Sequence, residues 1–106
     1  MVDTRSPIYV VDDEEAIRKS LSFMLKTSGY EVRTFDDGRS FLEEATGLPL
    51  GCVLLDVRMP DMDGLEVQEA LRTAGSAHPV IIMTGHGDVD TAVAAMKGGA
   101  LDFIEK

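Results

Sequence analysis

Three short, uninterrupted apolar runs constrain the fold of this chain more than any other feature of its sequence. They cover residues 8–11, 52–55 and 80–83, are rich in valine and isoleucine, and show no alternation with polar residues. Such runs are typical of strands that are covered on both faces, as the strands of a parallel sheet are. We therefore expect a central parallel sheet with helices on its two faces.

Helical patterns separate these runs. In the first of them, apolar residues recur at helical spacing behind an acidic first turn, and Gly29 is the expected stop. A short edge strand is predicted over residues 30–35 and a last strand over residues 101–106. The apolar positions that define the four helices are Ala16, Ile17, Leu21, Met24 and Leu25; Phe41, Leu42 and Ala45; Leu65, Val67, Ala70 and Leu71; and Val89, Ala92, Val93 and Met96.

The predicted order is strand and helix in alternation, four times over, followed by a fifth strand. This alternation implies right-handed crossovers and a doubly wound α/β fold. The length of 106 residues, with no linker or internal repeat, fits one domain over residues 1–106. Ligands bind such sheets at the carboxyl ends of the strands, so polar residues directly after strands are the candidate functional residues.

Composition and charge exclude several classes of function. With 44% hydrophobic and 27% charged residues, the chain is neither a disordered tail nor a disulfide scaffold. Its 19 acidic and 10 basic residues give a formal net charge of −9, which disfavours DNA binding by this domain. The single cysteine, Cys52, gives no sign of an oxidising compartment, and the first residues form neither a signal peptide nor a membrane span. We expect a cytoplasmic domain without membrane contact.

Polar side chains stand where four of the predicted strands end. Asp12 and Asp13 follow the first strand, Asp56 the third, Thr84 ends the fourth and Lys106 the fifth. If these strands are adjacent and parallel, all five side chains converge on one small area. Three carboxylates, a hydroxyl and an ammonium group would then share one pocket.

Three carboxylates in one pocket repel one another unless a cation or protons neutralise them. An all-oxygen site without histidine or cysteine suits a hard ion, and room for water and a phosphate oxygen suits Mg²⁺ better than Ca²⁺. Phosphoryl transfer fits this set of groups. Asp56 would be the nucleophile, while Mg²⁺ and Lys106 offset charge on the phosphoryl oxygens and Thr84 donates a hydrogen bond to one of them.

Each of these residues also has a purely structural explanation. Asp13 can belong to the acidic first turn of a helix, Thr84 to a turn before a glycine, and Lys106 can be a solvated charge. Asp56 is different because it ends an apolar run that should be buried, where an unpaired carboxylate is costly. The joint placement of these residues at strand ends favours a functional site.

Four motifs occur in order along the chain: VVDDE at 10–14, LLDVRMPDMDG at 54–64, IMTGHG at 82–87 and ALDFIEK at 100–106. Together they resemble the receiver domain of bacterial two-component response regulators, within the CheY-like superfamily. The amino-acid sequences of the last two motifs are similar to those in receivers of the FixJ and NtrC kind. The resemblance implies a flavodoxin-like parallel sheet of five strands in the order 2-1-3-4-5.

The same resemblance implies a role for each matching residue. Asp56 would accept a phosphoryl group from a sensor histidine kinase. Asp13 would bind Mg²⁺ directly and Asp12 largely through water, while Asp56 and the backbone carbonyl of Arg58 would complete the protein ligands. Arg58 and His86 occupy positions that flank the hydrolytic water and would tune dephosphorylation.

Signalling would follow from three further positions. Thr84 is the expected switch hydroxyl, Phe103 the switch aromatic and Lys106 the phosphate-binding lysine. Movement of Thr84 would vacate space that Phe103 fills, which alters the surface of the fourth helix and the fifth strand. The domain would be a phosphorylation-regulated signalling module that catalyses only its own phosphorylation and dephosphorylation, and not an enzyme in the usual sense.

The chain departs from the family at its end. Receivers usually continue from the lysine into a proline and a fifth helix, whereas this chain stops at Lys106. We therefore expect a fragment that lacks the fifth helix, leaves one apolar sheet face uncovered and forms a homodimer or a swapped oligomer. We also expect this fragment to lack the DNA-binding output domain that normally follows such receivers, so DNA binding is expected only through that domain.

Two other functions use similar residues. A phosphatase of the haloacid dehalogenase type also needs an Asp nucleophile, Mg²⁺, a Thr and a Lys, but its signature requires a second Asp where Arg58 stands. A flavin-binding electron carrier of similar topology needs a hydroxyl-rich phosphate loop after the first strand, whereas residues 12–15 are acidic and would repel the phosphate. Both are less favoured alternatives.

Overall fold

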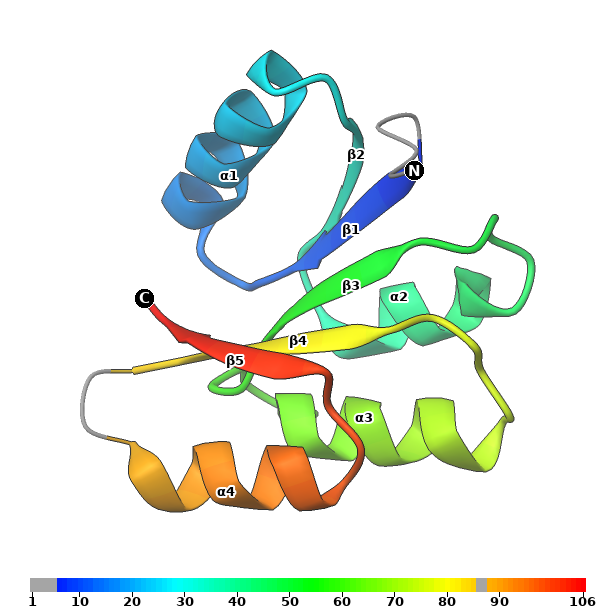
Figure 1. Ribbon diagram of the computed structural model, residues 1–106, viewed down its shortest axis with the longest axis vertical. Helices are drawn as coiled ribbons and strands as arrows, with labels where there is room; N and C mark the ends of the chain where they lie inside the picture. Colours follow the sequence, from blue (N-terminus) through cyan, green and yellow to red (C-terminus); the bar gives the residue numbers. More distant parts are fainter. Residues whose placement is uncertain (1–5, 86–87) are drawn as a thin grey trace.

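The computed structural model describes residues 6–85 and 88–106. Its centre is a parallel sheet with the strand order β2-β1-β3-β4-β5, with α1 on one face and α2, α3 and α4 on the other (Figure 1). The predicted doubly wound fold and strand order are thus confirmed. The strands are Pro7–Val11 (β1), Glu31–Phe35 (β2), Cys52–Asp56 (β3), Val80–Thr84 (β4) and Asp102–Glu105 (β5); the helices are Glu15–Thr27 (α1), Gly38–Ala45 (α2), Gly64–Thr73 (α3) and Val89–Lys97 (α4).

Alternate side chains of the central strands fill two separate cores, because successive residues of a strand point to opposite faces of the sheet. Val11 and Leu55 lie in the larger core, beneath α2, α3 and α4. Val10, Leu54 and Met83 lie in the smaller core, on the face of α1. The three apolar runs therefore form strands with side chains buried on both faces, as predicted.

The helices bury fewer of their apolar residues than the spacing predicts. Helix α1 has no fully buried residue, and Met24 is 54% exposed. Helix α4 packs through the small side chains of Ala92 and Ala95, which leaves Val89 and Val93 exposed. An apolar helical stripe is wider than the strip that contacts the sheet, so its flanking positions remain in solvent.

Strand β5 is shorter than predicted by one residue at each end, and all four of its residues are exposed. It is an edge strand that pairs only with β4, so few side chains cover it. Lys106 directly follows it, and the Lys106 amide donates a hydrogen bond to the Thr84 carbonyl over 2.9 Å. No helix within the described ranges is long and apolar enough to cross a membrane.

Close packing joins α3 to the end of β3. Gly64, the first residue of α3, donates its amide hydrogen to the Val57 carbonyl over 2.9 Å. A Cβ atom at this position would lie 2.4 Å from the Asp56 carbonyl oxygen, a contact that real structures do not show. Glycine therefore allows the start of α3 to lie directly against the residue that we expect to be functional.

Candidate functional site

The sheet register brings the predicted site residues together at one edge. Asp56 pairs with Met83 and Thr84 pairs with Glu105, so β3, β4 and β5 end side by side. Asp12, Asp13 and Asp56 each offer a carboxylate oxygen, and these three oxygens all lie within 4.8 Å of one another. Asp12 and Asp56 are buried, whereas Asp13 is exposed. The predicted convergence of the three carboxylates is present in the structure.

Asp56 is a buried carboxylate with one oxygen left free of hydrogen bonds. Its Oδ1 accepts the Arg58 amide over 3.3 Å, whereas its Oδ2 has no hydrogen-bond partner among the described residues. Burial, followed by the nearby Asp12 charge, raises the pKa of Asp56 to about 6, although Lys106 acts in the opposite direction. A buried, unpaired carboxylate oxygen is costly, so its retention here points to a ligand or a reaction at this atom.

Lys106 is the cation of the pocket. Its Nζ lies 3.0 Å from Asp12 Oδ2 and 3.2 Å from Asp56 Oδ1, and it donates to Glu14 Oε1 over 3.1 Å. Burial acts to lower the pKa of Lys106, but the Asp12, Glu14 and Asp56 carboxylates outweigh it and raise that pKa. The sequence predicted the lysine and the aspartates, but not Glu14 as a partner.

The loop from β1 to α1 is held by three hydrogen bonds to Asp12. The Asp12 amide donates to the Phe35 carbonyl over 3.1 Å, and Asp12 Oδ1 accepts the Glu14 amide over 2.9 Å. The Asp12 carbonyl accepts from Arg18 Nη1 over 2.8 Å. Sequence reasoning missed Arg18, although its spacing places this charged residue on the same helical stripe as Leu21 and Leu25.

Two ion pairs hold the loop that follows Asp56. Arg58 Nη2 lies 2.8 Å from Asp88 Oδ2, next to the start of α4, and Arg39 Nε lies 2.6 Å from Asp61 Oδ2. The Thr91 hydroxyl and then Arg58 lower the pKa of Asp88. Asp61 has a positive φ of 70°, which lets the chain turn back toward α3. His86, the other residue predicted to tune dephosphorylation, lies outside the described residues.

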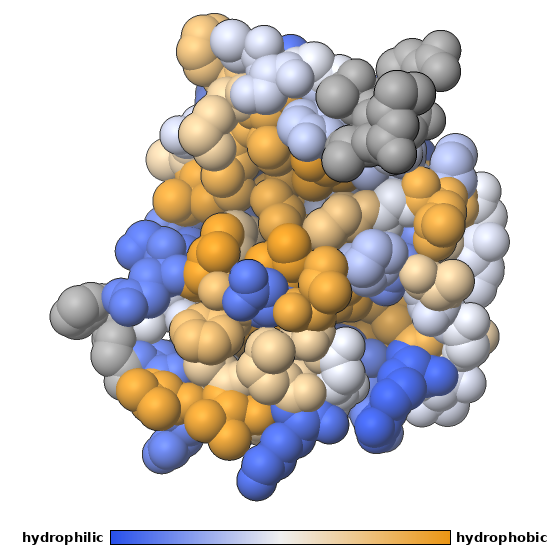
Figure 2. Space-filling view, viewed as in Figure 1, coloured by the Kyte–Doolittle hydropathy of each residue, from blue (hydrophilic) through white to orange (hydrophobic). Residues whose placement is uncertain are grey.

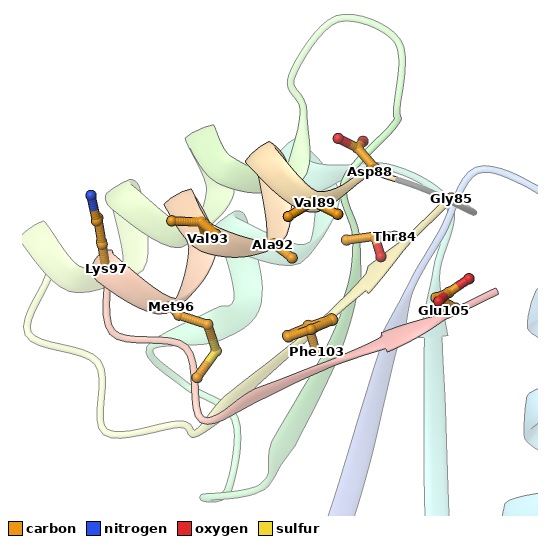
Figure 3. A pocket seen from close by; sticks show the side chains of 10 residues that line it. All are labelled: Thr84, Gly85, Asp88, Val89, Ala92, Val93, Met96, Lys97, Phe103 and Glu105. Atoms are coloured by element: carbon orange, nitrogen blue, oxygen red, sulfur yellow. The ribbon is translucent and has the colours of Figure 1, made fainter.

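Thr84 and Phe103 line one apolar pocket between α4 and β5. The pocket has a volume of about 280 Å³, and Figure 3 shows the Phe103 ring between Met96 of α4 and Thr84 of β4. Thr84 is buried and its hydroxyl reaches the Ile104 carbonyl only at 3.5 Å, whereas Phe103 is 43% exposed. Thr84 and Phe103, which were predicted to act together in the switch, therefore line the same pocket.

The donor set fits a small, hard cation. Asp56 Oδ2 is buried without a hydrogen bond among the described residues, the buried Asp12 Oδ2 has the Lys106 ammonium 3.0 Å away, and all three candidate ligand atoms are carboxylate oxygens. Oxygen-only sites with few protein ligands are typical of Mg²⁺, which keeps several of its waters. The residues present therefore match the predicted ion.

The fold and the site together define a flavodoxin-like α/β domain with an acidic pocket, a lysine and a hydroxyl at the carboxyl edge of its sheet. Comparison with known proteins narrows this class. The pattern of the response regulator receiver domain matches residues 8–106, and the chain belongs to this family. This membership decides against the phosphatase and the flavin carrier.

Several curated relatives are named as regulatory proteins. The chain is 52% identical over 103 residues to the transcriptional regulatory protein FixJ of Bradyrhizobium diazoefficiens. The matched region covers 97% of this chain and 50% of that protein. The chain is 46% identical over 99 residues to the tetrathionate response regulatory protein TtrR of Salmonella typhimurium, covering 93% of this chain and 48% of that protein. The chain thus spans about half the length of the curated relatives it matches.

Solved structures agree. The crystal structure of FixJ-N superposes with a TM-score of 0.93 at 46% identity and covers 100% of this chain and 83% of that one. The chemotaxis protein CheY4 of Vibrio cholerae superposes with a TM-score of 0.88 at 30% identity, covering 96% of this chain and 87% of that one. The chain is a FixJ-like receiver domain of a two-component response regulator, a signalling domain.

Proposed function

We propose that Asp56 accepts a phosphoryl group from the phosphohistidine of a sensor histidine kinase. The Asp56 carboxylate attacks phosphorus, an O–P bond forms, the P–N bond breaks, and an acyl phosphate results. The observation that carries this proposal is the buried Asp56 Oδ2, which lacks a hydrogen bond among the described residues and lies in a pocket with a lysine. With its pKa raised to about 6, Asp56 is mostly ionised at neutral pH and therefore available as the nucleophile.

Mg²⁺ would neutralise charge on the transferred phosphoryl oxygens. Asp13 would hold it directly and Asp12 largely through water, with Asp56 and the Arg58 backbone carbonyl as further ligands. The three carboxylates already lie within reach of one ion, and Lys106 partly neutralises Asp12 and Asp56 without it. The pocket is thus arranged before the ion enters, which lowers the cost of binding.

Lys106 and Thr84 would contact the new phosphoryl oxygens. The Lys106 ammonium already lies 3.2 Å from Asp56 Oδ1, so it would offset the added charge. The Thr84 hydroxyl gives up only the long contact with Ile104 when it turns toward the phosphoryl group. Breaking this long, weak hydrogen bond costs little free energy.

Phe103 would carry the signal to the surface. It is half-exposed and borders the α4–β5 pocket, so a shift of Thr84 changes the space available to its ring (Figure 3). The exposed Val89, Val93 and Met96 of α4 would then present a different surface to a second copy or to an output domain. DNA would be contacted only through that output domain.

Arg58 and His86 would set the lifetime of the acyl phosphate. The Arg58 guanidinium is held by Asp88 and is exposed near the acceptor loop, where it can affect the approach of water. We assign this pair to tuning and not to the transfer itself.

Acetyl phosphate, a small phosphoryl donor, tests the proposed function. Intact-mass measurement should show one added phosphoryl group when Mg²⁺ is present and none when a chelator removes it. The Asp13→Asn variant should need much more Mg²⁺ for the same uptake. Uptake that is independent of Mg²⁺ and unchanged in Asp13→Asn would contradict the proposed metal site.

A further inference from the structure

Arg18 reaches back from α1 to the loop that carries two of the expected metal ligands. Its Nη1 donates a hydrogen bond of 2.8 Å to the backbone carbonyl of Asp12, in a partly buried position. That carbonyl belongs to the peptide bond that joins Asp12 to Asp13. Fixing its direction fixes the plane from which the Asp13 side chain emerges.

The rest of α1 gives this loop little support. The helix begins after Glu14, whose side chain makes no capping hydrogen bond, and none of its residues is fully buried. Its packing on the sheet runs through partly buried side chains such as Leu21 and Leu25. The Glu14 amide, just before the helix, donates to Asp12 Oδ1, whereas the bond from Arg18 comes from within the helix and fixes the Asp12 carbonyl.

We propose that Arg18 is a positioning residue that presets Asp12 and Asp13 for Mg²⁺. The inference rests on the proposed function, because it assumes that the ion binds in the acidic pocket. Arg18 acts through the Asp12 carbonyl and makes no contact with the ion. Partners that orient metal ligands in this way typically change metal affinity by about 10- to 100-fold when they are removed.

Loss of the Arg18 charge and loss of its hydrogen bond should change the Mg²⁺ affinity in opposite directions. This difference makes the proposal testable. The guanidinium repels a divalent cation, so loss of its charge alone would tighten Mg²⁺ binding. Loss of the hydrogen bond releases the loop and weakens Mg²⁺ binding. A weaker affinity after a positive charge has been removed is therefore the signature of positioning.

The experiment measures the Mg²⁺ dissociation constant by NMR titration of the backbone amides of Asp56 and Thr84. Arg18→Met keeps an unbranched side chain but loses charge and donors. Lys19→Met is the matched control, since Lys19 is the next residue, is exposed and pairs only with Glu15 among the described ion pairs. Arg18→Met should bind Mg²⁺ about 10-fold more weakly, and Lys19→Met as tightly as the parent or slightly more so.

Arg18→Lys is a second test of the hydrogen bond apart from the charge, and it replaces Arg18→Met if that variant does not fold. It keeps the charge but loses the planar guanidinium that reaches the carbonyl, so Mg²⁺ binding should again weaken. Equal affinity in Arg18→Lys and the parent, or binding by Arg18→Met as tight as by Lys19→Met, would overturn the proposal. Asp13→Asn distinguishes the two failures: if it also leaves the affinity unchanged, the ion does not bind at this site and the proposed function itself is wrong.

Discussion

The ammonium group of Lys106 lies 3.2 Å from the Asp56 carboxylate, although the two residues end different strands of the sheet. The backbone bond from the Lys106 amide to the Thr84 carbonyl holds the lysine beside β4 and within reach of β3. Burial and the Asp12 charge favour the protonated form of Asp56, while Lys106 favours the ionised form. The pKa of Asp56, the proposed acceptor, is thus set by opposing effects, and a metal ion or a phosphoryl group would change their balance.

Asp56 should make the metal-free domain less stable as the pH rises. Its pKa of about 6 in the folded state lies above the unfolded value of about 3.9, so the folded state holds the proton more tightly. This contribution is fully present below pH 4 and is lost as the pH rises through 6. In a chelating buffer, Asp56→Asn should therefore be more stable than the parent by about 2–3 kcal/mol at pH 7, with little difference at pH 4.

Asp61→Asn is the control for this pH profile, because Asp61 is an exposed acid in the adjoining loop. Its difference from the parent in the free energy of unfolding should stay small across the same range. A parent and an Asp56→Asn variant that lose stability in parallel between pH 4 and pH 7 would contradict the shifted pKa. Denaturant titrations at fixed pH supply the measurement.

Lys106→Met should have opposite effects with and without metal. Without Mg²⁺ the domain should lose stability, because three carboxylates lose their shared cation. With Mg²⁺ the affinity for the ion should rise several-fold, since a competing charge has left the pocket. Lys97→Met, on the exposed end of α4, should change neither quantity, and a fall in Mg²⁺ affinity in Lys106→Met would count against the pocket as described.

Thr84→Ala should separate phosphorylation from its surface effect. Asp56 should still take up a phosphoryl group from acetyl phosphate, because Thr84 is not the acceptor. The NMR signals of the Phe103 ring, which shift on phosphorylation of the parent, should shift much less in the variant, since the hydroxyl no longer moves toward the phosphoryl group. Thr73→Ala, at the exposed end of α3, is the control; equal Phe103 shifts in Thr84→Ala would exclude the proposed coupling.

Self-association should involve the sheet face between α1 and β5. Figure 2 shows an apolar area there, and Ile104 of β5, which pairs with Met83 of the smaller core, is 43% exposed. Covering about 300 Å² of apolar surface contributes about 7 kcal/mol before the cost of association. Melting temperature and scattered-light mass should therefore rise with protein concentration.

In the unphosphorylated chain Ile104→Thr should weaken this association, whereas Val93→Thr should not, because the α4 surface is proposed to change only after phosphorylation. Ile104 pairs with Met83, whose side chain lies on the face of α1, while Val93 stands at the α4–β5 pocket. A parent chain that stays monomeric at high concentration, with a constant melting temperature, would show that the apolar face needs no partner.

Much of the site was predictable because the sequence marks where strands end. An apolar run followed by Asp12 or Asp56 fixes both the strand and the edge on which the carboxylate lies, and the parallel sheet then brings those edges together. Local patterns do not specify which side chains meet across loops. The bonds from Arg58 to Asp88 and from Lys106 to Glu14 depend on loop paths and rotamers, so neither was predicted.

Helix burial was the weaker part of the prediction for a related reason. Helical spacing shows which residues share a face, but not how wide a strip the sheet covers. Val89 and Val93 fit the pattern of α4 and are exposed, since the contact runs through Ala92 and Ala95. Arg18 is the opposite case, a charged residue at an apolar position of the helix. It is held there by a hydrogen bond to the Asp12 carbonyl, and only the fold identifies this partner.

The most direct test of the account is the site of phosphoryl uptake. With acetyl phosphate and Mg²⁺, the parent and Asp61→Asn should each gain the mass of one phosphoryl group, and peptide mapping should place it on Asp56. Asp56→Asn should gain none, because the amide is not a nucleophile toward phosphorus. Full uptake by Asp56→Asn, or a phosphoryl group mapped to another residue in the parent, would contradict the assignment of Asp56 as the acceptor.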